Sequence, residues 1–526
     1  MGNLYTGIMT TKTIMTSATL PSSLHPSTLA WTPYHHARVR TCNQASLNSE
    51  GAYILVWMQT SHRFSYHHGL EYAVAWANEL QKPIVVYEAL HCDDPWACDR
   101  FHSLELDFME EHVAFAATHE KAQKGMWAYW PHLEEKAGSA EAGFEILAKD
   151  AAIIISDDFP VGPVPVRHNH WAARVDVPYV LVDSNGLIPL GQTQKDPYSA
   201  YIFRKIVQKS FREAMEVMPS ADPLGELNIA NAAIQEKLPA SLSTHAPHGG
   251  AIFGDRERWL ASLPIRHDIG VVETRGTREA ALQRMEAFMT FDLLEYDEKR
   301  NHPDEHKTSR LSPWLHFGVL SAHEVVEAAL AKMPDGWSMD ELTYVGGKSE
   351  GFFQGDPNIE SFLNEVVTWR EVGYHYCHHR PDYADYESLP DWAMTTIEEH
   401  HADVRPHVYT FDQLEKAQTH DTLWNAAQQQ LRQDGIIHNY LRMLWGKKVI
   451  EWAPDMETAL TWLIELNNQW AIDGRNPNSY SGIFWCFGRF DRAWQEREIF
   501  GKLRYMSSDN TRKKVRMERY LKEYAL

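Results

Sequence analysis

Two tryptophans lie seven residues apart in the stretch HNYLRMLWGKKVIEW, residues 438–452, whose pattern predicts a helix. Seven residues make about two turns, so the indoles of Trp445 and Trp452 share one face, about 10 Å apart along the axis. An indole can pass on an electron as well as fill a core. The spacing therefore leaves two interpretations open, a path for electrons and ordinary core packing.

A carboxylate and an indole share a helical face further upstream. Glu365 and Trp369 stand four residues apart in FLNEVVTWREVGYHY, and residues at that spacing are neighbours on a helix. A surface pair is one interpretation of this spacing. The rest of the helix is apolar, however, which favours a buried setting for the carboxyl group.

Three small hydroxyl residues, Thr308, Ser309 and Ser312, stand just before the predicted helix of TSRLSPWLHFGVLSAHEVVEAAL. Hydroxyls together with the free N–H groups of a helix start can hold an anion. Isolated serines and threonines at such positions more often only cap the helix. Both interpretations stay open on the residues alone.

The tail after Trp494 is basic, although the chain of 526 residues carries a net charge of −21. The tail holds nine lysines and arginines against five acids, which leaves +4. The overall charge argues against a chain that coats nucleic acid everywhere, but a local basic edge can still face phosphates. A solvated C-terminal helix is the alternative interpretation.

The composition is that of a globular chain with a high aromatic content. Aromatic residues make up 12%, with 19 Trp, which favours stacking on flat ligands or bases. The five cysteines are scattered, as in a reducing compartment, and the adjacent histidine pairs are poor chelates, so no metal site is predicted. No apolar run of 18 residues occurs, so no membrane span is predicted.

The elements that must position these residues fall into two classes. Strand-like runs alternate with helical patterns in the first half of the chain, at residues 52–59, 83–90, 125–132, 151–160 and 179–184. This alternation predicts an α/β domain with a parallel sheet and a ligand crevice at the carboxyl ends of its strands. From about residue 277 the pattern is helical nearly to the end.

The same patterns predict the order of domains. Residues 1–47 are expected to form a flexible tail, because the first thirty are rich in Thr and Ser. Residues 48–200 form the α/β domain, and residues 201–270, interrupted by Pro, Gly, Ser and His, form an inter-domain linker. Residues 271–526 form the helical domain.

Five motifs occur in the order TSRLSPWLHFG, LWNAAQ, LRMLWGKKVIEW, LNNQWAIDGRNPN and RAWQEREIFGKLRYMS. Together they resemble the photolyase/cryptochrome family, and in particular the class II cyclobutane pyrimidine dimer photolyases, over residues 48–515. The resemblance implies a Rossmann-like antenna domain followed by an all-α FAD-binding domain. It also implies light-driven DNA repair, in which reduced FAD lends an electron to a flipped-out thymine dimer.

The resemblance assigns a cofactor site by motif position. The TSRLSP loop would hold the FAD phosphates through Thr308, Ser309, Leu311 and Ser312. Asn467, the first Asn of LNNQW, would lie next to flavin N5, where an amide can donate or accept a hydrogen bond without adding charge. Arg370 and Arg442 match cationic positions around the flavin.

A lesion pocket follows from the same comparison of motifs. Glu365 matches the carboxyl group that hydrogen-bonds the carbonyls of the lesion, for which it should be protonated or shared with a donor. Trp369 and Trp485 match the indoles that wall the pocket. Met443 matches an apolar contact beneath the dimer.

Two further groups of residues are implied by the resemblance. Trp494 and Arg504 match residues that fill the gap left in the duplex, and Asp491 matches a class II position of the same DNA-binding loop. The basic tail then faces DNA. The tryptophans of the class II electron relay, which would carry an electron from the surface to oxidised FAD, match Trp424, Trp445 and Trp452.

Some residues depart from the class II pattern. Asn439 replaces the usual Gly, the loop 485–494 is shorter by one residue, and the tail after Met506 differs. A divergent subgroup and a cryptochrome-like photoreceptor without repair activity therefore stay open. Retention of the lesion-pocket residues favours the repair enzyme over the photoreceptor. A (6-4) photolyase would need a histidine acid that this pocket does not match.

The remaining expectations concern cofactors, partners and location. The resemblance leaves room for a second, light-harvesting chromophore in the antenna domain, a deazaflavin or a folate. The expected partner is UV-damaged DNA, bound by a monomer. The expected location is the cytoplasm with access to DNA, or the nucleus in a eukaryote.

Overall fold

A computed structural model describes residues 18–29, 32–230, 232–242 and 253–525. The chain divides into two compact units that alternate along the sequence. The first unit is Met1–Gln194, Arg212–Leu282 and Trp314–Val325, and the second is Lys195–Phe211, Gln283–Pro313 and Val326–Leu526. The sequence predicted consecutive domains instead, because local patterns do not reveal when a chain returns to an earlier unit.

The first unit contains one seven-stranded sheet in the order β1-β2-β7-β6-β3-β4-β5. The strands are β1 Ala18–Thr19, β2 Val39–Thr41, β3 Tyr53–Met58, β4 Ile84–Leu90, β5 Trp127–Leu133, β6 Ala151–Asp157 and β7 Tyr179–Val182. The pairs from β7 to β5 are parallel, whereas β1–β2 and β2–β7 are antiparallel. The predicted parallel sheet of an α/β domain is thus confirmed, with all five predicted strands.

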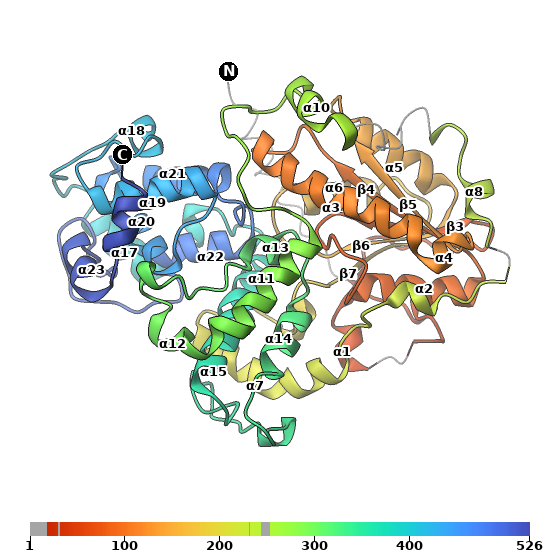
Figure 1. The fold of residues 1–526 in the computed structure, drawn as a ribbon, viewed down its shortest axis with the longest axis horizontal. Coiled ribbons are helices and arrows are strands. Elements are labelled where there is room, and N and C mark those ends of the chain that lie inside the picture. Colours follow the sequence, from red (N-terminus) through yellow and green to blue (C-terminus); the bar gives the residue numbers. More distant parts are fainter. Residues whose placement is uncertain (1–17, 30–31, 231, 243–252, 526) are drawn as a thin grey trace. The chain divides into compact units, whose positions relative to one another are not determined.

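Both faces of this sheet are covered (Figure 1), which explains the continuous apolar runs of its strands. Successive residues of β3 alternate between two core clusters, one on each face. One cluster includes helix α2 (His68–Leu80), and the other includes α5 (Ser139–Lys149) and α6 (Pro163–Ala172). The other helices of the early chain are α1 Pro33–His36, α3 Asp99–Thr118 and α4 Glu120–Gln123.

The range 1–47, predicted as a flexible tail, is partly ordered. Residues 1–17 and 30–31 lie outside the described residues, but β2 pairs with β7 in the register Val39↔Val182 and Thr41↔Val180. Three residues are too short a strand to show a period, so the sequence did not reveal it. Pairing with the buried strand β7 supplies the hydrogen bonds that order this segment.

The range 201–270, predicted as a linker, contains helices in its described part. They are α7 Ala200–Glu216, α8 Ile234–Lys237 and α10 Arg256–Ser262. Phe203, Val207 and Phe211 of α7 are buried at a spacing of four residues, so one face of this helix is part of a core. Residues 231 and 243–252 of the range lie outside the described residues.

The remaining helices confirm the predicted all-α region. They are α11 Arg278–Phe291, α12 Tyr296–Lys299, α13 Ser312–His316, α14 Ala322–Leu330, α15 Pro357–Leu363, α16 Arg370–His379, α17 Asp391–Glu399, α18 Phe411–Glu415, α19 Thr422–Asp434, α20 Asn439–Trp452, α21 Met456–Trp470, α22 Pro477–Cys486, α23 Ser508–Lys514 and α24 Glu518–Glu523. A π-helical turn, η10, spans Asn364–Trp369. Short 3-10 turns lie at Ser22–Leu24, Leu190–Gln192, Pro223–Glu226, Phe253–Asp255, Leu293–Glu295, Pro303–Glu305, Met339–Glu341 and Tyr386–Ser388.

Helix α22 is the centre of packing in the second unit, with α16, α20 and α21 against it; Figure 1 labels α20, α21 and α22. Two glycines allow the close approach. A Cβ on Gly373 of α16 would lie 2.7 Å from Ser481 Oγ, and one on Gly446 of α20 would lie 2.7 Å from Cys486 Sγ. Among the described helices, none combines the length and apolar character needed to cross a membrane.

Candidate active site

The loop 308–312, expected to hold phosphates, is anchored by one arginine of helix α11. Arg284 donates from Nε to the carbonyl oxygen of Ser309 at 2.8 Å and from Nη2 to that of Thr308 at 2.9 Å. Leu311 is buried, whereas Ser312 is exposed. The backbone of the loop is therefore held in place by hydrogen bonds from helix α11. Arg284 was not predicted, because an arginine within a helix of apolar spacing gives no sign of its partner in the sequence.

A buried imidazole beside this loop fits a phosphate-bearing ligand. Neither ring nitrogen of His438 has a hydrogen-bond partner among the described residues, although both atoms are buried. Burial, and then the nearby charges of Arg310, His306 and His302, lower the pKa of His438 to about 4, so the ring is neutral near pH 7. Buried nitrogens cost free energy unless something pairs with them, and an anionic ligand can do so beside the guanidinium of Arg310.

Asn467 is held in one orientation by its neighbours. Its Oδ1 accepts a hydrogen bond from Arg442 Nη1 at 3.3 Å, and its Nδ2 donates to Asn468 Oδ1 at 3.2 Å. Arg442 is fixed in turn by Asp473, 2.6 Å from its Nη2. An amide has two donors and two acceptor lone pairs. The buried Asn467 therefore keeps one of each for a ligand, as its expected place next to flavin N5 requires.

Arg370, the other cation expected at the cofactor, is buried at the start of α16. Its guanidinium lies 4.6 Å from the centre of the Tyr374 ring, and its Nη2 donates to the Tyr374 hydroxyl at 3.2 Å. Asn476, the N-cap of α22, donates to the same hydroxyl at 3.1 Å. Arg370 thus belongs to the contact between α16 and α22.

Glu365 lies in the π-helical turn η10 and pairs with an arginine that was not predicted. Its Oε1 is 2.6 Å from Nη1 of Arg300, and the two side chains are 26% and 23% exposed. Burial acts to lower the pKa of Arg300, but the Glu365 carboxylate and the Tyr296 hydroxyl together outweigh it and raise that pKa. Arg300 therefore places a donor beside the carboxyl group, which is one of the two settings expected for Glu365. π-helical turns occur frequently at functional sites.

Trp369 and Trp485 stack on each other. Their ring centres are 4.7 Å apart and their planes differ by 12°. At this separation the rings touch, so a base can lie against the outside of the pair but not between them. Arg204 of α7, which was not predicted, holds its guanidinium 5.6 Å from the Trp369 ring and donates from Nε to Asn364 Oδ1 at 2.8 Å.

Met443 is half-buried on α20, and its carbonyl oxygen is 4.0 Å from Cys486 Sγ, the residue after Trp485. The thioether therefore comes from a helix that packs against α22, the helix that carries Trp485.

The expected DNA-binding residues form one cluster. Asp491 Oδ2 lies 2.9 Å from Arg504 Nε, and Asp491 Oδ1 accepts a hydrogen bond from Trp494 Nε1 at 3.2 Å. The Arg504 guanidinium lies 4.6 Å from the Trp494 ring and 5.9 Å from the Trp485 ring. Trp494 is 40% exposed. This cluster therefore extends from solvent to the stacked pair.

The three tryptophans of the expected relay are together and buried. Trp424 and Trp452 meet edge to face, with ring centres 5.5 Å apart. Trp424 Nε1 donates to the carbonyl oxygen of Trp445 at 3.0 Å. Their exposed fractions are 0% for Trp424, 4% for Trp445 and 1% for Trp452. None of the three therefore provides the surface end of a relay.

The basic tail is docked on the second unit by some of its own cations. Arg516 Nη1 lies 2.8 Å from Glu305 Oε1, and Arg519 donates to the carbonyl oxygen of Asp304. Arg512 donates to the Thr422 hydroxyl at 2.7 Å. The cations left exposed for phosphates include Lys513 and Lys514, so a DNA-facing edge would be narrower than the sequence suggested.

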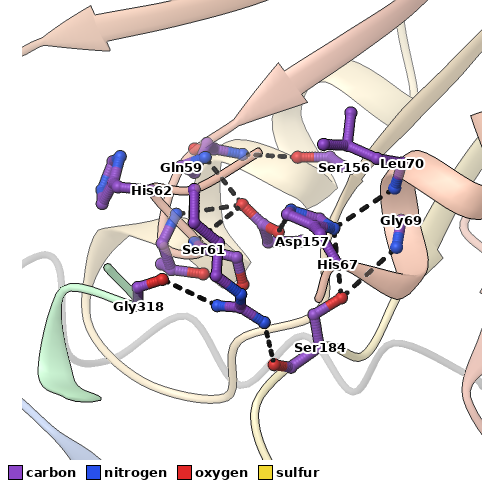
Figure 2. Close-up of polar contacts among 12 residues, drawn as sticks. Gln59, Ser61, His62, His67, Gly69, Leu70, Ser156, Asp157, Ser184 and Gly318 are labelled. Atoms are coloured by element: carbon purple, nitrogen blue, oxygen red, sulfur yellow. Dashed lines mark hydrogen bonds and ion pairs between the residues drawn. The ribbon is translucent and has the colours of Figure 1, made fainter. Parts of the chain in front are cut away.

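The first unit has its own polar centre, at the carboxyl ends of β3 and β6, where the sheet order reverses (Figure 2). The Asp157 carboxylate accepts hydrogen bonds from the backbone N–H groups of Gln59, Thr60 and Ser61 at 2.8, 3.0 and 3.3 Å. Burial acts to raise the pKa of Asp157, but His67 and these N–H groups lower it below its ordinary value. The backbone N–H groups that could bind an anion at this point are therefore already bound to the carboxylate of Asp157.

Comparison with known proteins gives close relatives in sequence. A deoxyribodipyrimidine photo-lyase of Methanothermobacter thermautotrophicus is 30% identical over 488 residues, which cover 93% of this chain and 98% of the relative. A deoxyribodipyrimidine photo-lyase of Potorous tridactylus is 30% identical over 373 residues, which cover 69% of this chain and 62% of the relative. No protein-family model matches the chain.

Solved structures share the fold at lower identity. A class III photolyase from Agrobacterium tumefaciens has a TM-score of 0.58 and 16% identity, covering 91% of this chain and 87% of its own. A photolyase from Sulfolobus tokodaii, solved with two FAD molecules, has a TM-score of 0.57 and 13% identity, covering 89% of each chain. These likenesses support the fold of an α/β region followed by helices.

Proposed function

The chain belongs to the photolyase/cryptochrome family, and from this premise we propose that it is a DNA photolyase that splits cyclobutane pyrimidine dimers with light, using FAD. FAD supplies the absorption of blue light and the one-electron chemistry when it is bound. The chain's own residues would bind the cofactor and the lesion. The relatives named as deoxyribodipyrimidine photo-lyases support this activity over a purely sensory one.

One observation carries the proposal, the stacked pair Trp369–Trp485, with a carboxylate four residues from Trp369 and a cation–indole cluster at Trp485. Glu365 stands four residues before Trp369, and Arg504 reaches both Trp485 and Trp494. A flipped dimer needs an apolar wall, a group for its carbonyls and a filler for the gap it leaves. The stacked indoles would supply the wall, Glu365 the group for the carbonyls, and Trp494 with Arg504 the filler.

The proposed cofactor site uses the loop 308–312, His438 and the Arg442–Asn467 pair. The loop and the neutral imidazole of His438 would hold the phosphates, and Arg310 would add charge. Asn467, oriented by Arg442, would offer one N–H and one oxygen lone pair to the flavin ring. The basic residues beside the loop would balance the negative charge of a dinucleotide.

Glu365 would act together with Arg300 on the carbonyl oxygens of the lesion. Arg300 has further N–H donors beside the one directed at Glu365, since a guanidinium carries five. The carboxylate orients this donor, and the donor in turn keeps the carboxylate in place. A lesion carbonyl could then accept from Arg300, or from Glu365 if the carboxyl group takes up a proton on binding.

The test is repair by the purified protein. The protein is reduced with light, mixed with an oligonucleotide that contains one cyclobutane dimer, and the loss of dimer is followed in light and in darkness. We expect loss only in light, and a decrease of about tenfold or more in Glu365→Gln, because a hydrogen bond to a charged group is worth 1.5–3 kcal/mol. Glu298→Gln, at an exposed site of α12, is the matched control.

The outcomes separate the proposal from its alternatives. Dimers that persist in light, in a protein whose flavin is reduced normally, would exclude repair and favour the photoreceptor. Loss of a (6-4) photoproduct but not of a cyclobutane dimer would move the substrate to that class. Repair that is unchanged in Glu365→Gln would remove Glu365 from the lesion pocket.

A further inference from the structure

A buried lysine contacts the C-terminal end of helix α22. Lys447 of α20 is 1% exposed, and its Nζ donates to the carbonyl oxygen of Cys486 at 2.5 Å. Cys486 is the last residue of α22 and directly follows Trp485 of the stacked pair. Lys447 also stands four residues after Met443, so these two side chains share one face of α20. This face of α20 is therefore directed at the end of α22.

The charge of Lys447 is buried without an ion-pair partner among the described residues. Asp491 acts on Lys447 from beyond ion-pair distance and is itself paired with Arg504. The centre of the Phe500 ring lies 6.0 Å from Lys447 Nζ. A buried ammonium group that lacks a carboxylate lowers the stability of a fold unless other groups compensate for the lost water. The end of α22 must therefore supply that compensation.

The last carbonyl groups of α22 show how it does so. The carbonyl oxygens of Phe484 and Trp485 accept hydrogen bonds from backbone N–H groups of the turn that follows, whereas that of Cys486 receives Lys447 Nζ. The C-terminal end of a helix carries partial negative charge, which a cation stabilises. The Lys447 ammonium group and the end of α22 therefore stabilise each other.

The turn after α22 connects this helix end to the expected DNA-binding cluster. It contains two residues of left-handed backbone, Gly488 at φ 98° and Phe490 at φ 63°, and leads directly to Asp491. Asp491 Oδ2 lies 2.9 Å from Nε of Arg504, whose guanidinium lies 5.9 Å from the Trp485 ring. A side chain that fixes the start of this turn therefore orients both Trp485 before it and the Asp491–Arg504 pair after it.

We propose that Lys447 is a positioning residue for lesion binding, whose charge holds the end of α22 and thereby sets Trp485 and Arg504 in the orientation that receives a flipped base. This inference rests on the proposed function, to which the lesion pocket belongs. Without the charge, the end of α22 adopts the binding orientation only part of the time, and the affinity for a lesion falls by that fraction. An intact duplex, which places no base in the pocket, keeps its affinity.

Lys447 changes its charge in a pH range where binding can be measured. Burial lowers the pKa of Lys447 to about 8; Cys486 and Asp491 oppose this shift, and Arg504 adds to it. The side chain is therefore charged below pH 8 and neutral above it, whereas an exposed lysine stays charged to about pH 10. The neutral amine can still donate a hydrogen bond to Cys486 but loses the attraction to the helix end.

The test is binding in darkness of fluorescent duplexes, with and without one cyclobutane dimer, by the FAD-loaded protein between pH 7 and 9. The wild-type affinity for the dimer duplex should fall about fivefold across this range, which is the effect of one charge at a helix end. Lys447→Gln keeps a donor without the charge, so it should show this loss already at pH 7 and no further change up to pH 9. Lys447→Arg keeps the charge throughout and should bind equally at pH 7 and 9.

The matched control is Lys416→Gln, at an exposed lysine of α18 paired with Asp412, which should keep the wild-type curve. A wild-type affinity for the dimer duplex that is constant from pH 7 to 9 would overturn the inference, as would a pH dependence that Lys447→Gln or Lys447→Arg retains. Equal losses for both duplexes in Lys447→Gln would also overturn it, since Lys447 would then act on the stability of the fold.

Two further outcomes are distinct. If Lys447→Gln does not fold, the comparison of the wild-type protein with Lys447→Arg decides on the same criterion, the loss of affinity between pH 7 and 9. A wild-type protein that binds both duplexes equally at pH 7 would instead overturn lesion binding itself, and with it the proposed function.

Discussion

Glu365 and Arg300 show how a single pair can prepare a site without stabilising the fold. Both side chains are about a quarter exposed, and ion pairs at such positions contribute about 0–1 kcal/mol to folding. The pair can nevertheless hold a donor and a carboxylate at fixed positions before a ligand arrives. The pair would then contribute by orienting the donor and the carboxylate toward the ligand. This effect can be measured only when the ligand binds or reacts.

Replacing Arg300 by Gln should therefore lower repair while leaving the fold intact. We expect a decrease of about tenfold, equal to ~1.4 kcal/mol, because Glu365 loses its orienting partner. Dimer loss per absorbed photon is the measurement, with bound flavin determined on the same sample. The control is Arg380→Gln, which breaks a half-exposed ion pair with Asp382. In that pair Arg380 Nη2 lies 2.6 Å from Asp382 Oδ2, the same distance as between Arg300 and Glu365. Equal repair by both variants would contradict the role of Arg300.

The stacked indoles Trp369 and Trp485 allow a second prediction about single residues. Trp369→Leu should weaken binding of a dimer-containing duplex by about fivefold or more, because stacking on an aromatic ring is worth 1–3 kcal/mol per base. Binding of an intact duplex should change little. Titration of fluorescent duplexes in darkness measures both affinities.

The matched control for that variant is Trp462→Leu. Trp462 is half-buried and packs edge to face on Phe411 in the same unit, with ring centres 6.0 Å apart. A loss of affinity for both duplexes in Trp369→Leu, with the same loss in Trp462→Leu, would indicate general destabilisation instead of contact with the lesion.

At the scale of elements, the C-terminal helix α24 is capped by a residue far away in sequence. The Asp304 carboxylate accepts hydrogen bonds from the backbone N–H groups of Tyr520 at 2.9 Å and Arg519 at 3.2 Å. These groups belong to the first turn of α24, which has no side-chain cap of its own. Asp304 lies four residues before Thr308, so the tail helix is tied to the proposed phosphate loop.

Asp304→Ala should loosen the tail and the loop together. Removing a helix cap costs about 1 kcal/mol, so we expect a lower midpoint of unfolding and faster release of bound flavin. Flavin fluorescence after dilution follows the release, and urea titration follows unfolding. Glu523→Ala, an exposed change at the other end of α24, should alter neither. A normal release rate in Asp304→Ala would show that the loop is held without the tail.

At the scale of the whole molecule, buried histidines make stability depend on pH. Burial lowers the pKa of His102, His132, His168 and His438 to about 4 each. In the unfolded chain these rings bind protons near pH 6.5. Between pH 6.5 and 4 the unfolded state therefore binds more protons than the folded state, and stability falls as the pH falls.

Urea unfolding at several pH values should reveal this proton uptake. Each of these histidines that becomes exposed in the measured unfolding transition should lower the free energy of unfolding by about 1.4 kcal/mol for each unit by which the pH is lowered. A hydrogen bond to Asp403 raises the pKa of the half-buried His400, which opposes the trend weakly. His102→Gln should reduce the slope by one proton, whereas the exposed His401→Gln should not. A stability that is flat from pH 6.5 to 4.5 would contradict the prediction.

The sequence by itself determined most of the elements and their order. The strands from β3 to β7 and the helix of residues 439–452 follow from apolar period and local propensity, which depend on neighbours in the chain. Shared spacing on one helix also placed Trp445 and Trp452 on one face. The order of the five motifs was enough to indicate the family. Short β2 and the π-helical turn η10 were missed, because neither has a period of its own. The helices α7, α8 and α10 were missed as well, because the Pro, Gly, Ser and His residues of the range 201–270 favoured a linker.

Only the tertiary structure decided which residues meet across these elements. Arg300 pairs with Glu365, Arg204 covers Trp369, Arg284 holds the loop 308–312, and Tyr409 covers Trp452. Each of these residues comes from a segment far from its partner in sequence. Local patterns set the conformation of a segment, but a contact between distant segments depends on how helices pack, and that is decided by the fold as a whole.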